Sequence, residues 1–210
     1  MGLHDFTFYD LINRNAQCFK DRPAWFEVDD GRTLTFAQYK EQVDRLACGL
    51  QNAGVEKGDR IGVLGINSLE YFLLYGAAAA LGAIMLPINW RLSPEEVAFN
   101  LNDCEPKVVF ADEEFQEVLD GLIEKLPSVE KYFDLKADGG NYLGFETLLD
   151  NQADFDPAEV FTDDGFVIIH TAAVAGRPRG SLLSHGNVLC ADVQFDYFFG
   201  MSPEDVNLNL

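Results

Sequence analysis

Positive charge is scarce in this sequence of 210 residues, where 15 lysines and arginines stand against 35 aspartates and glutamates and the formal net charge is −20. Nucleic acids and anionic membranes are bound through cationic surfaces, so this balance argues against both as bulk partners. An anionic ligand would need a local cluster of cations instead. The apolar content of 48% is that of an ordinary globular protein and excludes a disordered chain.

The sequence shows no pattern of disulfides or of metal ligands. Its four cysteines, Cys18, Cys48, Cys104 and Cys190, are widely spaced and match no framework of either kind. They lie in apolar or helical contexts, which predicts buried thiols in a reducing compartment and hence a cytoplasmic protein. The first five residues have no basic region and lead into no long apolar run, so no signal peptide is predicted.

One stretch without charge, residues 71–89, is long enough to be weighed as a membrane span. Gly76, Gly82 and Pro87 interrupt it, and alanines dilute its hydrophobicity. We therefore interpret it as a helix followed by a strand, both buried in a protein core, and expect no transmembrane span.

Short apolar runs alternate with segments of helical periodicity along most of the chain. This alternation predicts an α/β fold with a mostly parallel sheet flanked by helices. Residues 150–164 are acidic and weakly periodic, which indicates a linker or a surface loop. Strands are expected at 24–28, 33–35, 61–64, 83–88, 107–111, 129–133 and 166–169, and helices at 7–19, 36–53, 69–81, 94–102, 112–125, 144–149 and 185–199.

The most informative stretch is residues 166–181, FVIIHTAAVAGRPRGS. An apolar run typical of a fully buried strand leads into small residues and then into Arg177 and Arg179. Small side chains let backbone N–H groups approach an anion and arginines compensate its charge, so this order predicts a phosphate-binding loop. The alternative is a plain turn between strands with solvated arginines. Neither a G-x-G-x-x-G signature nor a Lys-Ser/Thr pair after Gly180 is present.

Residues 170–180 resemble the phosphate loop of the adenylate-forming enzymes, the AMP-binding superfamily of acyl-CoA synthetases, whose pattern is Tyr-Thr-Ser-Gly-Thr-Thr-Gly-x-Pro-Lys-Gly. Thr171, Gly176, Pro178 and Gly180 are kept, whereas Ala-Ala-Val-Ala replaces Ser-Gly-Thr-Thr. The family's lysine is replaced by an arginine, a cation of different reach and geometry. Further blocks follow in the family's order: LTF at 34–36, GDRIGV at 58–63, NSLE at 67–70, PINWRL at 87–92 and SLLSHGN at 181–187.

This resemblance implies that residues 1–210 are the N-terminal part of an AMP-binding domain with the acyl-CoA synthetase fold, similar to a long-chain-fatty-acid–CoA ligase. Such a ligase of fatty-acid and lipid metabolism uses ATP to convert a carboxylate to an acyl-adenylate with release of pyrophosphate, and coenzyme A then accepts the acyl group. Mg²⁺ would be bound largely by residues beyond Leu210, and no catalytic side chain or metal ligand is expected in this part. The residues implied at the ATP phosphates are Thr171, Ala172, Ala173, Val174, Ala175, Gly176, Arg179 and Gly180.

The family's aromatic substrate-pocket motif, its Tyr-Gly-x-Thr-Glu motif, its adenosine-binding Asp and its C-terminal catalytic Lys do not occur before Leu210. We therefore expect a fragment that is inactive alone. Two other interpretations stay open: a degenerate homologue that binds nucleotide or an acyl group without catalysis, and an adenylating enzyme for a different carboxylate. Peripheral membrane contact and oligomeric state stay open as well. His170 and His185 are expected to be structural, because neither has a partner acid or metal-ligand spacing nearby.

Overall fold

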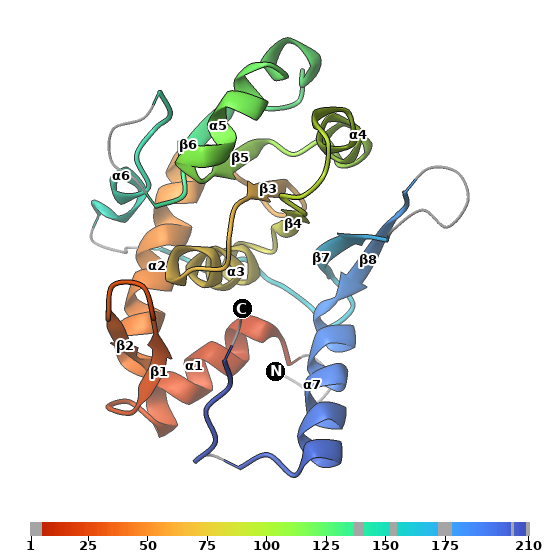
Figure 1. Ribbon diagram of the computed structural model, residues 1–210. Coiled ribbons are helices and arrows are strands. Elements are labelled where there is room, and N and C mark those ends of the chain that lie inside the picture. Colours follow the sequence, from red (N-terminus) through yellow and green to blue (C-terminus); the bar gives the residue numbers. More distant parts are fainter. Residues whose placement is uncertain (1–5, 137–140, 152–154, 172–177, 203, 209–210) are drawn as a thin grey trace.

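The computed structural model describes residues 6–136, 141–151, 155–171, 178–202 and 204–208 (Figure 1). Its helices are α1 (Phe8–Cys18), α2 (Phe36–Asn52), α3 (Leu69–Leu81), α4 (Pro94–Cys104), α5 (Glu113–Asp120), the 3₁₀ turn η1 (Ile123–Lys125), α6 (Glu146–Leu149) and α7 (His185–Phe199). Its strands are β1 (Pro23–Phe26), β2 (Thr33–Thr35), β3 (Arg60–Leu64), β4 (Ile84–Ile88), β5 (Val108–Ala111), β6 (Lys131–Asp134), β7 (Gly165–His170) and β8 (Gly180–Ser184).

A six-stranded sheet lies at the centre of the described part of the chain, in the order β6-β5-β3-β4-β7-β8. Every neighbouring pair is parallel except β7 and β8, which form an antiparallel hairpin at one edge. The strands β1 and β2 form a separate small hairpin. The prediction of an α/β fold with a mostly parallel sheet is thus confirmed.

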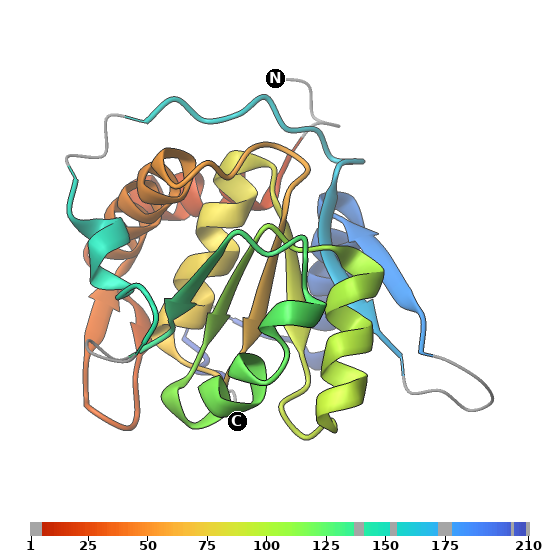
Figure 2. The ribbon, with the colours of Figure 1, turned by 90° about the horizontal axis from the view of Figure 1, so that it is seen from above.

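Helices cover both faces of this sheet, with α1, α2 and α3 on one side and α4 and α5 on the other (Figure 2). Successive side chains of a strand point to opposite faces, so Phe110 of β5 lies in the first buried cluster and its neighbour Val109 in the second. Because both faces are covered in this way, a ligand reaches the sheet most readily at the ends of its strands.

The local sequence explains where the helices begin. Thr35 and Ser93 each accept a hydrogen bond from a backbone N–H three residues later, and Gln38 and Glu96 return the bond to the capping residue. These are the expected capping boxes, and Pro94 adds a fixed first helical position.

The uncharged stretch 71–89 forms most of α3 and then β4, as predicted. The buried side of α3 packs into the first cluster together with Met85 of β4. Among the described residues, no helix combines the length and the apolar character that crossing a membrane requires.

The prediction of a fully buried strand at 166–169 holds for only half of its length. Phe166 and Val167 are buried, whereas Ile169 is 40% exposed. The pairing of β7 with β4 is confined to Val167 and Met85, and the other neighbour of β7 is the edge strand β8. Beyond Val167, the described ladder of β7 is therefore with β8. The strand β8 was not predicted, because its pairing depends on β7 rather than on a strong pattern of its own.

The single helix predicted at 112–125 is interrupted. The helix α5 ends at Asp120, and the chain continues through Gly121 into η1. A glycine inside a helix costs about 1 kcal/mol relative to alanine, which favours the break at this point.

The prediction of four buried thiols is wrong. All four cysteines are free, but Cys104 alone is buried, Cys48 is half-buried, and Cys18 and Cys190 are exposed. Each lies in a helix, and only Cys104 turns toward the sheet core. Helical location by itself therefore does not decide whether a thiol is buried.

The helix α7 continues from the end of β8 and extends away from the sheet (Figure 1). In the described structure only its first residue, His185, is buried. Four aromatic side chains near its other end are more than half exposed, namely Phe195, Tyr197, Phe198 and Phe199. Exposed aromatic groups in this number are unusual for the free surface of a monomer.

Candidate functional site

A cavity of about 700 Å³ opens at the carboxyl ends of β3, β4 and β7. Residues 65–67 after β3, 89–92 after β4 and 169–171 at the end of β7 line it, together with part of α4. The chain leaves β3 toward α3 on one face of the sheet and leaves β4 toward α4 on the other (Figure 2). Open α/β sheets bind ligands in the crevice where neighbouring connections diverge in this way. The cavity is therefore the candidate binding site.

An aromatic ring and a cation lie together on the wall of this cavity. The guanidinium carbon of Arg91 is 4.2 Å from the centroid of the Trp90 ring, and that ring stacks on Phe115 of α5 with centroids 6.0 Å apart. Trp90 remains 40% exposed. The exposed guanidinium group stacked over this ring suits an anionic ligand.

Asp112 holds the turn that follows β3 and was not among the predicted site residues. Its Oδ2 accepts a hydrogen bond of 2.7 Å from the N–H of Ile66, which lines the cavity. Burial raises the pKa of this carboxyl, and the Ile66 N–H opposes that shift. Its position directly after the buried run 108–111 is the signal that could have found it, since side chains at carboxyl ends of parallel strands meet at one edge.

The hairpin β7–β8 brings part of the predicted phosphate loop to the cavity. The N–H of Thr171 donates to the carbonyl of Arg179 over 3.1 Å, so these residues face each other where the chain leaves β7 and returns to β8. Thr171 and Pro178 line the cavity, and the Arg179 side chain is exposed. The other predicted loop residues lie outside the described part of the structure, namely Ala172, Ala173, Val174, Ala175 and Gly176, as does Arg177.

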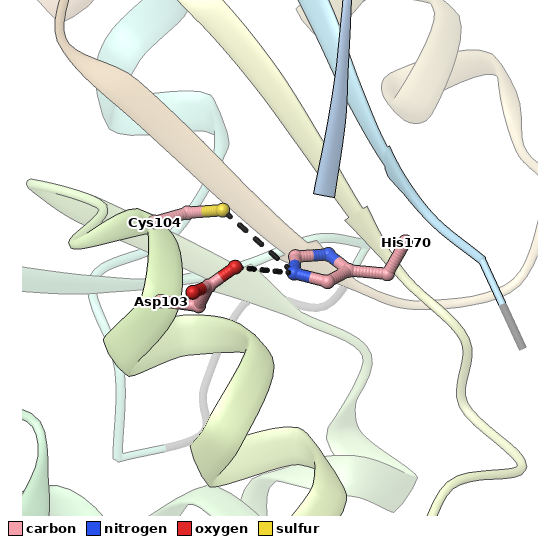
Figure 3. A group of neighbouring side chains, drawn as sticks. All are labelled: Asp103, Cys104 and His170. Atoms are coloured by element: carbon pink, nitrogen blue, oxygen red, sulfur yellow. Dashed lines mark hydrogen bonds and ion pairs between the residues drawn. The ribbon is translucent and has the colours of Figure 1, made fainter. Parts of the chain in front are cut away.

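His170, the last residue of β7, has a partner acid after all. Its Nε2 lies 3.1 Å from Asp103 Oδ2 and 3.9 Å from Cys104 Sγ, at the end of α4 (Figure 3). The expectation that no acid or metal-ligand grouping accompanies His170 is therefore wrong. These residues lie 66 and 67 positions apart in the chain, so no local pattern could reveal the contact.

A hydrogen bond from Arg60 holds the backbone at Cys104. The Nε of Arg60 donates to the Cys104 carbonyl over 2.6 Å, and the next residue, Glu105, adopts a left-handed conformation that ends α4. Burial raises the pKa of the Cys104 thiol to about 11. The free thiol is therefore protonated near neutral pH.

His185 is buried in the core, as expected of a structural side chain. Its Nδ1 accepts a hydrogen bond of 3.3 Å from the N–H of Phe8, and its ring stacks on Phe166 with centroids 4.7 Å apart. Burial lowers the pKa of this imidazole to about 4. The ring thus ties the start of α1 to the start of α7 in its neutral form.

The sequence profile of the AMP-binding enzyme family matches residues 12–210. This match covers nearly the whole chain, and the chain therefore belongs to that family. The fold and the resemblance of residues 170–180 to the family's phosphate loop agree with this assignment.

Several of the named relatives are CoA ligases. The indoleacetate–CoA ligase of Aromatoleum aromaticum is 35% identical over 158 residues, which are 74% of this chain and 31% of that protein. The long-chain-fatty-acid–CoA ligase of Thermus thermophilus is 30% identical over 185 residues, which are 86% of this chain and 34% of that protein. A crystal structure of a candidate long-chain-fatty-acid CoA ligase from Rhodopseudomonas palustris is 42% identical and superposes with a TM-score of 0.90, over 99% of this chain and 51% of that one. The chain thus spans about a third of the curated relatives' length.

Proposed function

We propose that this chain is the N-terminal part of an ATP-dependent acyl-CoA synthetase. The enzyme would activate a carboxylate, such as a fatty acid, as an acyl-adenylate and transfer the acyl group to coenzyme A. The observation that carries the proposal is the cavity at the carboxyl ends of β3, β4 and β7, which Thr171 and Pro178 border on either side of the family's phosphate loop. The relatives named as CoA ligases support it.

In this proposal, residues 171–180 contact the ATP phosphates mainly through backbone N–H groups. The replacement of Ser-Gly-Thr-Thr with Ala-Ala-Val-Ala removes side-chain hydroxyls and adds a methyl group at Ala173, but it leaves every backbone N–H in place. Arg179 is the described cation at the base of this loop, and a guanidinium group can bind two phosphate oxygens at once.

Mg²⁺ would be held by the triphosphate and by residues beyond Leu210. Among the described residues that line the cavity, the only carboxylate is that of Glu96. It accepts hydrogen bonds from the backbone N–H and the hydroxyl of Ser93, and the N–H bond lowers its pKa. This capping role leaves the described cavity wall without the paired oxygen ligands that Mg²⁺ prefers.

Two further features are part of the proposal. The exposed aromatic side chains of α7 are suited to burial against additional polypeptide, which supports a longer parent protein.

The four free cysteines support a reducing compartment, for which we propose the cytoplasm. The fatty-acid ligase among the relatives supports a role in lipid metabolism.

The experiment is a product assay on the full-length protein that contains this chain, with ATP, coenzyme A and a panel of aliphatic and aromatic carboxylates. We expect acyl-CoA, AMP and pyrophosphate with at least one carboxylate. Residues 1–210 alone should form no acyl-CoA above a control without protein. Acyl-CoA formation by residues 1–210 alone would contradict the assignment of the catalytic machinery to the rest of the protein.

A further inference from the structure

Three side chains with metal-binding chemistry converge beside the cavity. Asp103, Cys104 and His170 each offer one ligand atom, and the three atoms lie within 4.8 Å of one another. Figure 3 shows the carboxylate and the thiol approaching the same ring nitrogen of His170 from the end of α4. Nothing in the proposed ligase reaction uses this group.

The spacing of these atoms fits a tetrahedral metal. With Zn–N and Zn–O bonds of about 2.0 Å and a Zn–S bond of about 2.3 Å, tetrahedral angles place N and O about 3.3 Å apart and N and S about 3.5 Å apart. In the structure these two distances are 3.1 Å and 3.9 Å, each within a few tenths of an ångström of the tetrahedral value.

The surroundings also suit an ion. The side chain of His170 is only 6% exposed, whereas that of Asp103 is 43% exposed and offers a path from solvent. The residue opposite His170 in β8 is Gly180, so no side chain occupies that position next to the imidazole. The net charge of −20 favours cations in general.

We propose that Asp103, Cys104 and His170 form a binding site for a divalent transition metal of the Zn²⁺ class, which fastens the end of β7 to the end of α4. Thiolate and imidazole ligands select Zn²⁺ or Co²⁺ over Mg²⁺, which prefers oxygen ligands. The metal preference of this site would therefore differ from that of the site for the Mg²⁺ that accompanies ATP. Three protein ligands leave the fourth position of the metal to water. On binding, the Cys104 thiol loses its proton to solvent and becomes the thiolate ligand.

The test is a titration of tag-free, chelator-treated protein of residues 1–210 with Co²⁺. We expect one equivalent to bind with micromolar affinity or better and to produce a thiolate-to-cobalt charge-transfer band in the near ultraviolet. Zn²⁺ should remove that band by displacement, and millimolar Mg²⁺ should not. Zn²⁺ should also raise the unfolding temperature, because a ligand that binds only the folded protein stabilises it.

Substitutions at the three residues test which side chains bind the metal. Cys104→Ser should abolish the charge-transfer band, and His170→Gln should lower the affinity at least about tenfold. Asp103→Asn changes an exposed, isosteric side chain and so tests the site even if a buried replacement fails to fold. It should lower the affinity while the far-ultraviolet circular dichroism stays unchanged. Cys190→Ser, at an exposed thiol on α7, is the matched control and should bind Co²⁺ as the wild type does.

Two outcomes would overturn the proposal. One is the absence of the charge-transfer band in folded wild-type protein, which would leave His170 and Asp103 as a simple hydrogen-bonded pair. The other is a band that survives in Cys104→Ser and disappears in Cys190→Ser.

Discussion

Gly180 lies directly opposite His170 in the β7–β8 hairpin, and a Cβ atom at position 180 would come within 3.3 Å of His170 Nε2. The same Cβ would lie 2.8 Å from Cγ2 of Ile168, closer than carbon atoms approach each other in proteins. Gly180 is one of the positions at which this chain keeps the family's phosphate-loop pattern. In this protein the glycine therefore makes room for the side chains of the neighbouring strand.

The first prediction follows from that contact. Gly180→Ala should lower the free energy of unfolding by about 1–3 kcal/mol, because Ile168 and His170 must move to admit the methyl group. Urea unfolding of residues 1–210, followed by tryptophan fluorescence, measures the loss.

The matched control is Gly121→Ala. Gly121 has a right-handed backbone conformation, and an added Cβ would meet its nearest neighbour at 3.6 Å, an ordinary contact. This variant should not lower the stability and should raise it by up to about 1 kcal/mol, because alanine loses less backbone freedom on folding. Equal effects of the two substitutions would show that the hairpin does not pack as described.

The second prediction concerns His185 and pH. The folded protein keeps this imidazole neutral down to a pKa of about 4, whereas the unfolded chain takes up the proton near pH 6.5. The unfolded state therefore binds more protons between these values, and stability should fall as the pH is lowered through this window, by up to about 3 kcal/mol.

The control variant for this prediction is His185→Gln. Its side chain can still accept a hydrogen bond from the Phe8 N–H, but it does not titrate. Its free energy of unfolding should depend less on pH between 6.5 and 4 than that of the wild type. Carboxylates titrate in both proteins, so the difference between the two curves is the quantity to measure. Parallel curves would remove His185 as the source of the pH dependence.

The third prediction tests Arg179 in the full-length protein. A hydrogen bond to a charged phosphate oxygen contributes about 1.5–3 kcal/mol, which corresponds to about a tenfold or greater change in affinity. Arg179→Ala should therefore raise the KM for ATP about tenfold or more and leave the KM for coenzyme A nearly unchanged.

Arg45→Ala is the control for that substitution. Arg45 is a partly exposed arginine of α2 that pairs with Glu41 at 2.9 Å and does not line the cavity. Its removal should leave both KM values at the wild-type level. Unaltered ATP kinetics in Arg179→Ala would remove Arg179 from the phosphate site.

Much of the fold follows from local sequence signals. The expected helix at 69–81 agrees with α3 in both of its ends, because Ser68 caps its start and Gly82, with a φ of 66°, closes it. The strand expected at 107–111 likewise corresponds to β5, and the apolar run Val-Val-Phe-Ala at 108–111 is its signal. These signals are local, so a single sequence is sufficient to read them.

The features that were missed depend on contacts between distant segments. The strand β8 forms because the chain folds back on β7, and its own residues carry little strand signal. The cluster at His170 forms because the order of the strands places β7 beside β4, and α4 follows β4. The burial of the cysteines depends on which side of each helix faces the sheet, and Cys18 and Cys190 face away from it.

The central claim is that the loop after β7 belongs to an enzyme that adenylates a carboxylate. Its most direct test is exchange of labelled pyrophosphate into ATP by the full-length protein, with and without a carboxylate and in the absence of coenzyme A. The account predicts exchange that requires both the carboxylate and Mg²⁺. Saturable binding of ATP without any carboxylate-dependent exchange, across aliphatic and aromatic acids, would contradict it and would favour a homologue that binds nucleotide without catalysis.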